Sequence, residues 1–249
     1  IDEYDKPLLQ NLHDEEMQNR FRNMLKPFYG VLKTMDRAIR FALLTGVTKF
    51  GKVSVFSDLN NLDDISMREP YAAICGITET ELRTHFDEDI HTLASALERT
   101  YEEARSLLRK RYDGYHFVAG GPGIYNPFSL LNTFKYMRPE DYWFETGTPS
   151  YLVELLKHTH YDLYELANTE TDADVLNSID STSSNPVPVI YQSGYLTIKD
   201  YDSRFGIYKL GFPNLEVEEG FVKYLLPFYT SVSAPKTPFE IGRFVREVE

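Results

Sequence analysis

Polar side chains that could take part in phosphoryl transfer stand directly after two apolar stretches. Asp2 and Glu3 follow Ile1, which has the character of the last residue of a buried strand. Thr45 follows the short apolar run Ile39–Leu44, a pattern typical of a strand buried on both faces of a parallel sheet. Because the carboxyl ends of parallel strands form the ligand-binding edge of an open α/β sheet, we expect these side chains to lie side by side.

A carboxylate pair at a strand end suits nucleotide hydrolysis. Phosphoryl transfer needs a metal ion over the phosphates and an oriented nucleophile, and Asp2 with Glu3 could supply both requirements. An acidic pair after a strand is more often structural or solvent-facing, however, so the pair does not establish the chemistry by itself. The presence of Thr45 at a second strand end is what favours a nucleotide-hydrolysing sheet.

The segment Gly46–Val53 nearly matches the phosphate-loop pattern G-x-x-x-x-G-K-[ST] and follows the predicted strand. That pattern needs a hydroxyl at its last position to hold Mg²⁺, and this chain has Val53 there. Ser54 comes one residue later, where a helix would turn it by about 100° from the required direction. We therefore predict that this segment does not cradle a phosphate.

Composition narrows the class of protein. The 249 residues are 42% hydrophobic and 26% charged, which is globular composition, and the net charge of −12 disfavours a broad nucleic-acid-binding face. The single cysteine, Cys75, excludes an internal disulfide and fits a cytoplasmic location. No apolar run reaches the length of about 20 residues that a membrane helix needs, so we expect no membrane partner. The chain starts with Ile1 at the foot of a motif, and we interpret it as a fragment.

Helical patterns cover much of the first half of the chain. An apolar stripe that should face a sheet consists of Met17, Phe21, Met24, Phe28, Val31 and Met35. Pro27 lies within this stripe and predicts a kink or a break. Between residues 71 and 112, two capping boxes, each a Thr with a Glu three residues later, predict short helices that begin after Thr78 and Thr100.

The region after residue 113 has the order of a winged helix. A short helix near Val189 precedes two alternating strands, Tyr195–Asp200 and Ile207–Phe212, and Gly206 permits the turn between them. A helix should follow Asn214. The basic residues Lys199, Arg204 and Lys209 could form a DNA-contacting wing, although an ordinary solvated hairpin is the commoner explanation and winged helices often contact proteins.

Several longer strings are more specific together than any one of them. They are DEYDKPLL (2–9), FALLTGVTKFGKVSVFSDLNNLDDIS (41–66), YDGYHF (112–117), YNPFSLLN (125–132), YWFETGTP (142–149) and YQSGYLTIKDYD (191–202). This set resembles the bacterial AAA-ATPase-like family, whose members often carry a PD-(D/E)XK-type nuclease domain at the C-terminus. The likeness covers nearly the whole chain up to about residue 229.

The resemblance implies a role for each candidate site residue. Asp2 matches the Walker B aspartate that holds Mg²⁺, and Glu3 matches the glutamate that positions the attacking water. Thr45 falls where such enzymes keep a polar sensor of the γ-phosphate. The cofactors of the longer parent protein would be ATP and Mg²⁺, and nucleic acid would be a partner through its nuclease domain. The family's P-loop lies upstream of Asp2 and the Glu-x-Lys nuclease signature is missing, so we expect no tight nucleotide binding and no hydrolysis by this chain.

We therefore predict an α/β fragment of a P-loop ATPase core followed by a mainly helical region with a winged-helix-like α+β module. The predicted parts are the C-terminal half of the ATPase core (1–66), a helical segment (67–112), the winged-helix-like region (113–230) and a linker stub (231–249). The parent would be a nucleotide-dependent switch coupled to nucleic-acid processing. A competing interpretation makes residues 67–230 a nucleic-acid- or protein-binding module with the ATPase part as its scaffold.

Overall fold

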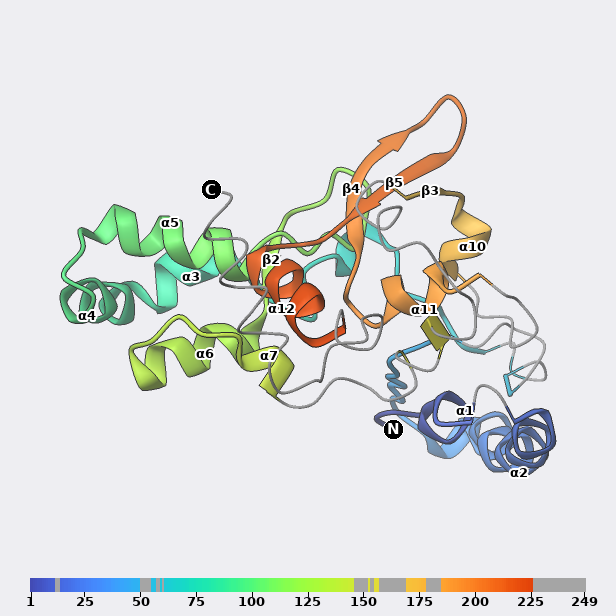
Figure 1. Ribbon diagram of the computed structural model, residues 1–249. Helices are drawn as coiled ribbons and strands as arrows, with labels where there is room; N and C mark the ends of the chain where they lie inside the picture. Colours follow the sequence, from blue (N-terminus) through green and yellow to red (C-terminus); the bar gives the residue numbers. More distant parts are fainter. Residues whose placement is uncertain are drawn as a thin grey trace. The chain divides into compact units, whose positions relative to one another are not determined.

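The computed structural model describes residues 1–11, 14–49, 55, 56, 59, 61–145, 152, 155, 156, 169–177 and 185–225. The contacts divide the chain into two compact units, whose elements are labelled in Figure 1. Unit 1 comprises Ile1–Ile65, Ser150–Tyr161 and Thr171–Gly194, and unit 2 comprises Ser66–Pro149, Asp162–Glu170 and Tyr195–Glu249. The predicted linker stub at 231–249 lies outside the described residues.

Unit 1 is built on a short helix and a long one. Its elements are α1 (Lys6–Leu9), α2 (Glu15–Thr34), the 3₁₀ helix η1 (Asp36–Ala38), α10 (Ala173–Asn177) and α11 (Val187–Gln192). The side chain of Asp14 caps α2 by accepting a hydrogen bond from the main-chain N–H of Met17 at 2.9 Å, as expected for a helix start. The core consists of Leu8, Leu9, Tyr29, Val55, Leu155 and Val189.

The structure corrects the prediction about which face of α2 is covered. Phe21, Leu25, Tyr29 and Leu32 pack into the core of unit 1. Four members of the predicted stripe are instead half or more exposed: Met24 (61%), Phe28 (62%), Val31 (51%) and Met35 (50%). The two sets share Phe21, which is covered as predicted, and after it the covered residues come one position later than the predicted ones, about 100° round the helix. Both sets have helical spacing, so periodicity alone cannot choose between them. The choice depends on the elements that pack on the helix.

Pro27 does not break α2, which runs without interruption from Glu15 to Thr34. Proline removes one backbone donor within a helix and leaves a carbonyl group without its partner. Pro27 lies on the exposed side, where water can satisfy that carbonyl. The expected break is therefore absent.

The run Ile39–Leu44 also differs from the prediction, because it is not a buried strand. Phe41 is 80% exposed and Leu43 is 45% exposed. Within the described part of the chain, the main-chain hydrogen bonds of Leu43 and Thr45 go to Ile1 and Tyr4 only. A strand is buried on both faces only when neighbouring strands and covering helices surround it, and the described residues provide one short neighbour.

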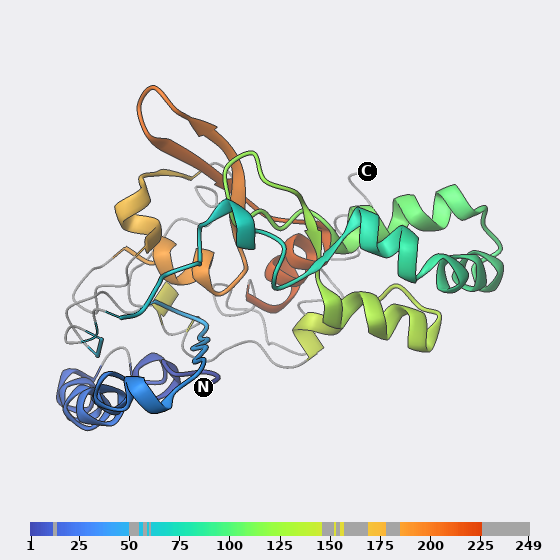
Figure 2. The ribbon, with the colours of Figure 1, turned by 180° about the vertical axis from the view of Figure 1, so that it is seen from behind.

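Unit 2 contains a group of short helices. Its first elements are η2 (Glu69–Tyr71), β1 (Ile77–Thr78), α3 (Glu79–His85), α4 (Asp87–Ala96), α5 (Tyr101–Tyr112), β2 (Ile124–Tyr125), α6 (Pro127–Tyr136) and α7 (Tyr142–Glu145). Both predicted capping boxes are confirmed at Thr78 and Thr100. The strands β1 and β2 pair antiparallel, and the view from behind in Figure 2 shows α3 to α6 as one helical group.

One apolar core joins these helices across the expected boundary at residue 112. It consists of Leu82, Ile90, Leu93, Ala94, Ala104, Leu108, Tyr112, Tyr125, Leu130 and Phe134. Because residues 82–112 share this core with residues 125–134, the division into separate parts at 67–112 and 113–230 differs from the observed units. The expected boundary near residue 66 coincides with the end of the first stretch of unit 1.

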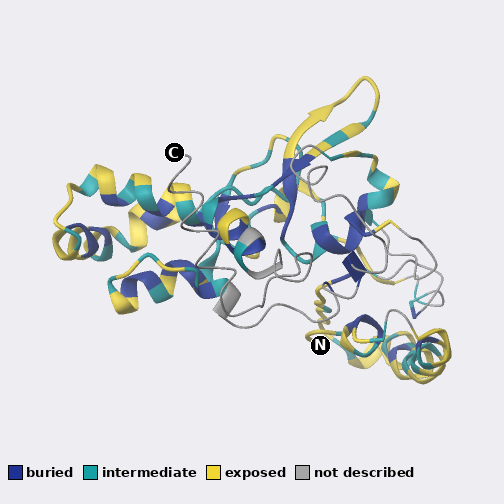
Figure 3. Cartoon of the chain, viewed as in Figure 1, coloured by how far each residue is buried: buried dark blue, intermediate teal, exposed yellow. Residues whose placement is uncertain are grey.

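The predicted hairpin is confirmed, with small shifts in its bounds. The strands β4 (Thr197–Asp202) and β5 (Ile207–Gly211) pair antiparallel, and β3 (Glu170–Thr171) lies on the other side of β5. Figure 3 shows that the hairpin passes from a buried base to an exposed tip. The helix α12 (Leu215–Leu225) follows the hairpin, as expected after Asn214. This order of elements does not by itself establish a winged helix, which stays a prediction.

The described helices include none that is both long enough and apolar enough to cross a membrane.

A buried carboxyl group connects three helices of unit 2. Glu216 on α12 is completely buried, and its Oε1 accepts hydrogen bonds from the hydroxyl of Ser129 on α6 (2.8 Å) and the main-chain N–H of Trp143 on α7 (3.0 Å). Its Oε2 is buried with no hydrogen-bond partner among the described residues. Burial raises the pKa of Glu216 to about 7, against these two hydrogen bonds, which lower it. The folded state therefore favours the protonated carboxyl group.

We predict that Glu216→Gln removes a pH dependence of the stability of unit 2. The reference pKa of a glutamate is 4.5, so the folded state binds this proton more tightly than the unfolded state. The stabilisation is complete below pH 4.5 and is lost as the pH rises towards 7. The wild-type free energy of unfolding should fall by about 3 kcal/mol over this window, and the glutamine variant should not show this fall.

Urea unfolding followed by the fluorescence of Trp143, the single tryptophan, measures this effect next to the group itself. Glu218→Gln is the matched control, because Glu218 is exposed on the same helix. If the profiles of the wild type and of Glu216→Gln run parallel between pH 4.5 and 7, Glu216 does not carry the proton.

Candidate functional site

Two segments of unit 1 run side by side at its polar end. The main-chain nitrogen of Ile1 donates to the carbonyl oxygen of Leu43 (2.8 Å), and the N–H of Thr45 donates to the carbonyl oxygen of Ile1 (2.9 Å). Ile1 thus bonds to both Leu43 and Thr45, which are two positions apart, and this is the hydrogen-bond pattern of parallel strands. The carbonyl oxygen of Thr45 then accepts from the N–H of Tyr4 at 3.0 Å, one residue beyond the regular parallel pattern, where Glu3 has a left-handed backbone. Asp2 and Thr45 therefore lie at the same end of the pair.

The structure brings the side chains of Asp2 and Thr45 into contact. The hydroxyl of Thr45 donates a short hydrogen bond to Oδ1 of Asp2, which also accepts from the main-chain N–H of Glu3 at 3.0 Å. The hydrogen bond from Thr45, more than that from Glu3, lowers the pKa of Asp2. Because its pKa is lowered, Asp2 is an ionised carboxylate; the residue is exposed, and both of these hydrogen bonds are to Oδ1.

Glu3 lies beside this contact in an uncommon conformation. Its φ of 49° is in the left-handed region, which costs a non-glycine residue about 1 kcal/mol. Its carboxylate forms an ion pair with the ammonium group of Lys6 at 2.6 Å, and both side chains are about half exposed. The sequence thus correctly anticipated the contact between Asp2 and Thr45. The three assigned roles, namely metal ligand, water-positioning group and phosphate sensor, stay predictions.

Asp5 is the residue of this site that sequence reasoning missed. Its side chain is fully buried, and Oδ2 accepts hydrogen bonds from the N–H (2.5 Å) and the hydroxyl (2.6 Å) of Thr48. Its Oδ1 accepts from the N–H of Val47 at 3.1 Å. A signal was present, because Thr45-Gly46-Val47-Thr48 is a small and polar run that needs an acceptor for its amides.

Tyr4 and Gly46 complete the support around Asp5. The phenol of Tyr4 donates to the carbonyl oxygen of Thr48 at 3.1 Å, and burial together with the charge of Asp5 raises the pKa of Tyr4, so the phenol keeps its proton. A Cβ at Gly46 would lie 2.5 Å from Oδ1 of Asp5 and 2.8 Å from Cε1 of Tyr4. Only glycine fits at this position.

The geometry bears on the near-match to a phosphate loop at Gly46–Val53. Two of its first amides, those of Val47 and Thr48, already donate to Asp5 and do not face a ligand. Residues 50–54, which include Lys52 and Val53, lie outside the described part. The prediction that the segment does not cradle a phosphate is thus tested only at its start, where the amides have another partner.

A divalent cation would find few protein ligands here. Within the described ranges, no group of three or more His, Cys, Asp or Glu residues is arranged to hold a metal ion. Mg²⁺ is commonly bound by one or two carboxylates together with phosphate oxygens and water. Asp2, with the adjacent hydroxyl of Thr45, could supply the protein ligand of such a site if a nucleotide supplied the phosphate oxygens.

The turn after Thr45 is also tied to α10 and α11. The N–H of Lys49 donates to Oε1 of Gln192 at 2.5 Å, and Nε2 of Gln192 donates to the carbonyl oxygen of Leu176 at 2.8 Å. The ammonium group of Lys49 forms a short ion pair with Asp64. These contacts fix the backbone that leaves the site.

The three basic residues of the hairpin have different surroundings. The ammonium group of Lys199 donates to the carbonyl oxygen of Pro213 at 3.1 Å. Lys209 is opposite Asp200 in the strand register, and the guanidinium of Arg204 lies over the ring of Phe205. The DNA-contacting wing has no support from these positions and stays a prediction.

We predict that Gly46→Ala destabilises unit 1. The new Cβ would collide with a carboxylate that three hydrogen bonds hold in place, so the free energy of unfolding should fall by about 1–3 kcal/mol. Gly30→Ala in α2 is the matched control, because a Cβ there meets no atom within 4 Å. That helical substitution should raise stability by about 0.5–1 kcal/mol.

Hydrogen exchange at the amide of Thr48 is the measurement, since this amide donates to Asp5. It should exchange faster in Gly46→Ala and not in Gly30→Ala. Unchanged exchange and unchanged stability in Gly46→Ala would mean that Asp5 does not hold the turn.

Comparisons with known proteins found one family model and one relative. Residues 1–56 match the model of an AAA-ATPase-like family described as "Predicted AAA-ATPase". A protein of Azotobacter chroococcum mcd 1, described as "Uncharacterized protein in vnfD 5'region", is 39% identical over 232 residues. That alignment covers 92% of this chain and 42% of the relative, so the chain spans less than half the length of the protein it matches. No solved structure matches the chain. The family match indicates a nucleotide-related role, and it contains Asp2, Glu3, Asp5 and Thr45.

Proposed function

We propose that this chain is part of an ATP-dependent switch protein and that the paired segments ending at Asp2 and Thr45 form one edge of its nucleotide site. The observation that carries the proposal is the hydrogen bond from the hydroxyl of Thr45 to the carboxylate of Asp2. It joins a potential metal ligand to a potential phosphate contact at the end of two parallel segments. The match of residues 1–56 to a predicted AAA-ATPase supports it independently.

Each side chain has a task that its environment suits. Asp2 stays ionised because Thr45 and the N–H of Glu3 donate to it, so its Oδ2 can contact a hydrated cation. When bound, Mg²⁺ with ATP would supply the positive charge that balances the phosphate oxygens during transfer. Thr45 can turn its hydroxyl from Asp2 to a phosphate oxygen, which makes the contact sensitive to the γ-phosphate.

Glu3 would orient the attacking water once it leaves Lys6. The ion pair between them is solvent-exposed, and such pairs contribute at most about 1 kcal/mol. Little free energy is therefore needed to separate Glu3 from Lys6. The free carboxylate can then accept a hydrogen bond from the O–H of the attacking water. Its left-handed backbone is the kind of local strain that clusters at functional sites.

The phosphate-binding loop would come from another part of a longer protein. The amides of Val47 and Thr48 are occupied by Asp5, so the start of the only near-match cannot supply the cradle. The relative extends well beyond the aligned region, which leaves room for such a loop. We further propose that the longer protein couples its nucleotide state to nucleic-acid processing, a proposal that rests on the family resemblance alone.

We predict that Glu3→Gln lowers kcat for ATP hydrolysis in the longer protein by about 10²- to 10⁴-fold, as expected for loss of a group that positions or activates water. ATP binding should persist, because glutamine keeps the shape of the side chain. Glu16→Gln, an exposed acid in the first turn of α2, is the matched control and should leave kcat unchanged.

The measurement is steady-state phosphate release, together with equilibrium binding of a fluorescent ATP analogue. The 249-residue chain should neither bind the analogue tightly nor release phosphate. Wild-type turnover by Glu3→Gln in the longer protein would remove the role assigned to Glu3. Turnover by the 249-residue chain that Glu3→Gln abolishes would show that the site is complete here and that Gly46–Ser54 was wrongly dismissed.

A further inference from the structure

The outer edge of β4 has no strand partner among the described residues; Ile198 at its base is buried (3% exposed), and the strand is exposed from Lys199 onward. The sheet order is β3-β5-β4, so β4 has a hydrogen-bonded neighbour on one side only among the described strands. Ile198 of β4 is opposite Leu210 of β5, and the N–H of Leu210 points away to the carbonyl oxygen of Thr169 at 2.8 Å. Ile198 and Leu210 are therefore a non-hydrogen-bonded antiparallel pair, in which the N–H and C=O groups of each residue point away from the other strand. The N–H and C=O of Ile198 therefore face the open edge.

A β-bulge at Lys199 shifts the next outward residue. The register passes from Ile198 opposite Leu210 to Asp200 opposite Lys209, so Lys199 is an extra residue. Tyr201, opposite Tyr208, is then the next position whose main chain faces outward. Its N–H is bonded to Oδ1 of the adjacent Asp200 at 2.8 Å, as expected for a donor that lacks a strand partner.

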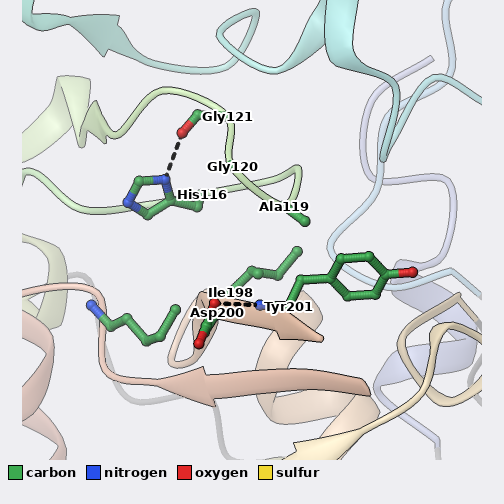
Figure 4. A pocket seen from close by; sticks show the side chains of 8 residues that line it. His116, Ala119, Gly120, Gly121, Ile198, Asp200 and Tyr201 are labelled. Carbon is green, nitrogen blue, oxygen red and sulfur yellow. Dashed lines mark hydrogen bonds between the residues drawn. The ribbon is translucent and has the colours of Figure 1, made fainter. Parts of the chain in front are cut away.

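A groove runs along this edge, with a volume of about 380 Å³. One wall is β4, with Ile198, Lys199, Asp200 and Tyr201, and the other is the loop with His116, Ala119, Gly120 and Gly121. Figure 4 shows the loop facing the strand across the open space, with the hydrogen bond between Asp200 and Tyr201 on the strand side. The space is therefore bordered by a strand edge and not by a helix or a sheet face.

The loop that forms the second wall is anchored at the base of β4. The N–H of His116 donates to the hydroxyl of Thr197 at 2.7 Å, and that hydroxyl donates back to the carbonyl oxygen of His116 at 3.1 Å. Nδ1 of His116 bonds to the carbonyl oxygen of Gly121 at 3.0 Å, which closes the loop on itself. These bonds fix the His116 end of the loop beside Thr197, and the groove begins at the next residue of β4, Ile198.

We propose that this groove binds an extended peptide segment of a partner protein, which adds to β4 as a further strand. An extended backbone offers donors and acceptors that complement the outward groups of Ile198 and Tyr201. Because the bulge adds one residue, the stretch from Ile198 to Tyr201 lies opposite only the two residue steps from Leu210 to Tyr208. It is therefore about 7 Å long at 3.3 Å per residue, which corresponds to about three partner residues. Asp200 holds the N–H of Tyr201 until the peptide replaces it.

The surroundings favour a peptide over the other candidates for the groove. A second folded copy of the chain would bring a hairpin and its neighbours, whereas the anchored loop leaves space for a single extended segment. The walls carry both Lys199 and Asp200, and the chain has a net charge of −12, so no basic surface attracts a nucleic-acid backbone.

The test is selection from a display library of short linear peptides against the full 249-residue chain, followed by affinity measurement on variants. Tyr201→Pro removes the outward N–H and should weaken binding by about tenfold or more. Asp200→Ala frees that N–H and should tighten binding several-fold. Glu88→Ala, an exposed acid on α4, is the matched control and should leave affinity unchanged.

Two further measurements cover the case in which Tyr201→Pro fails to fold. Hydrogen exchange at the amide of Tyr201 in the wild type should slow when a selected peptide binds. A version of that peptide methylated at alternate backbone nitrogens should lose affinity, because the contact is made by the main chain.

Several results would overturn the proposal. They are the selection of no binder, binding that neither Asp200→Ala nor backbone methylation changes, competition at the groove by single-stranded DNA of mixed sequence, and dimerisation of the chain through β4 in sedimentation experiments. None of these measurements involves ATP, so the outcome is independent of the proposed nucleotide site.

Discussion

The buried carboxylate of Asp5 organises the polar end of unit 1. A polar group in the interior is costly unless hydrogen bonds compensate for lost water, and the Asp5 side chain accepts three of them from Val47 and Thr48. These bonds fix the turn directly after Thr45. They also require glycine at position 46, since a side chain there would occupy the space of the carboxylate. The contact between Thr45 and Asp2 depends on this turn for its position.

From Asp5 the same turn connects to the rest of unit 1. Lys49 follows the turn and donates its N–H to Gln192, which in turn donates to Leu176. These bonds connect the end of the turn to α10 and α11. Unit 2 has its own central constraint, because Glu216 holds α12 against Ser129 and Trp143. In both units one buried carboxyl group fixes elements that are distant in the sequence.

Local patterns in the sequence predicted the features that local interactions create. The capping boxes at Thr78 and Thr100 need only residues three positions apart, and both are present. The hairpin follows from strand alternation and a glycine turn, and its strands shift by about two residues at most. The proximity of Asp2 and Thr45 was predicted from the rule that parallel strand ends share one edge. The two segments do pair there, but neither forms a regular strand.

The amino-acid sequence by itself thus determined where the capped helices begin, where the hairpin turns, and that Asp2 and Thr45 lie together. Only the tertiary structure decided which face of α2 is covered, because Phe21 and Phe28 have equivalent helical spacing and different neighbours. It likewise decided that Asp5 and Glu216 are buried acceptors, and that Tyr201 faces an open strand edge. These outcomes depend on contacts between residues far apart in the chain, where desolvation and the available partners set the energy and local propensity does not.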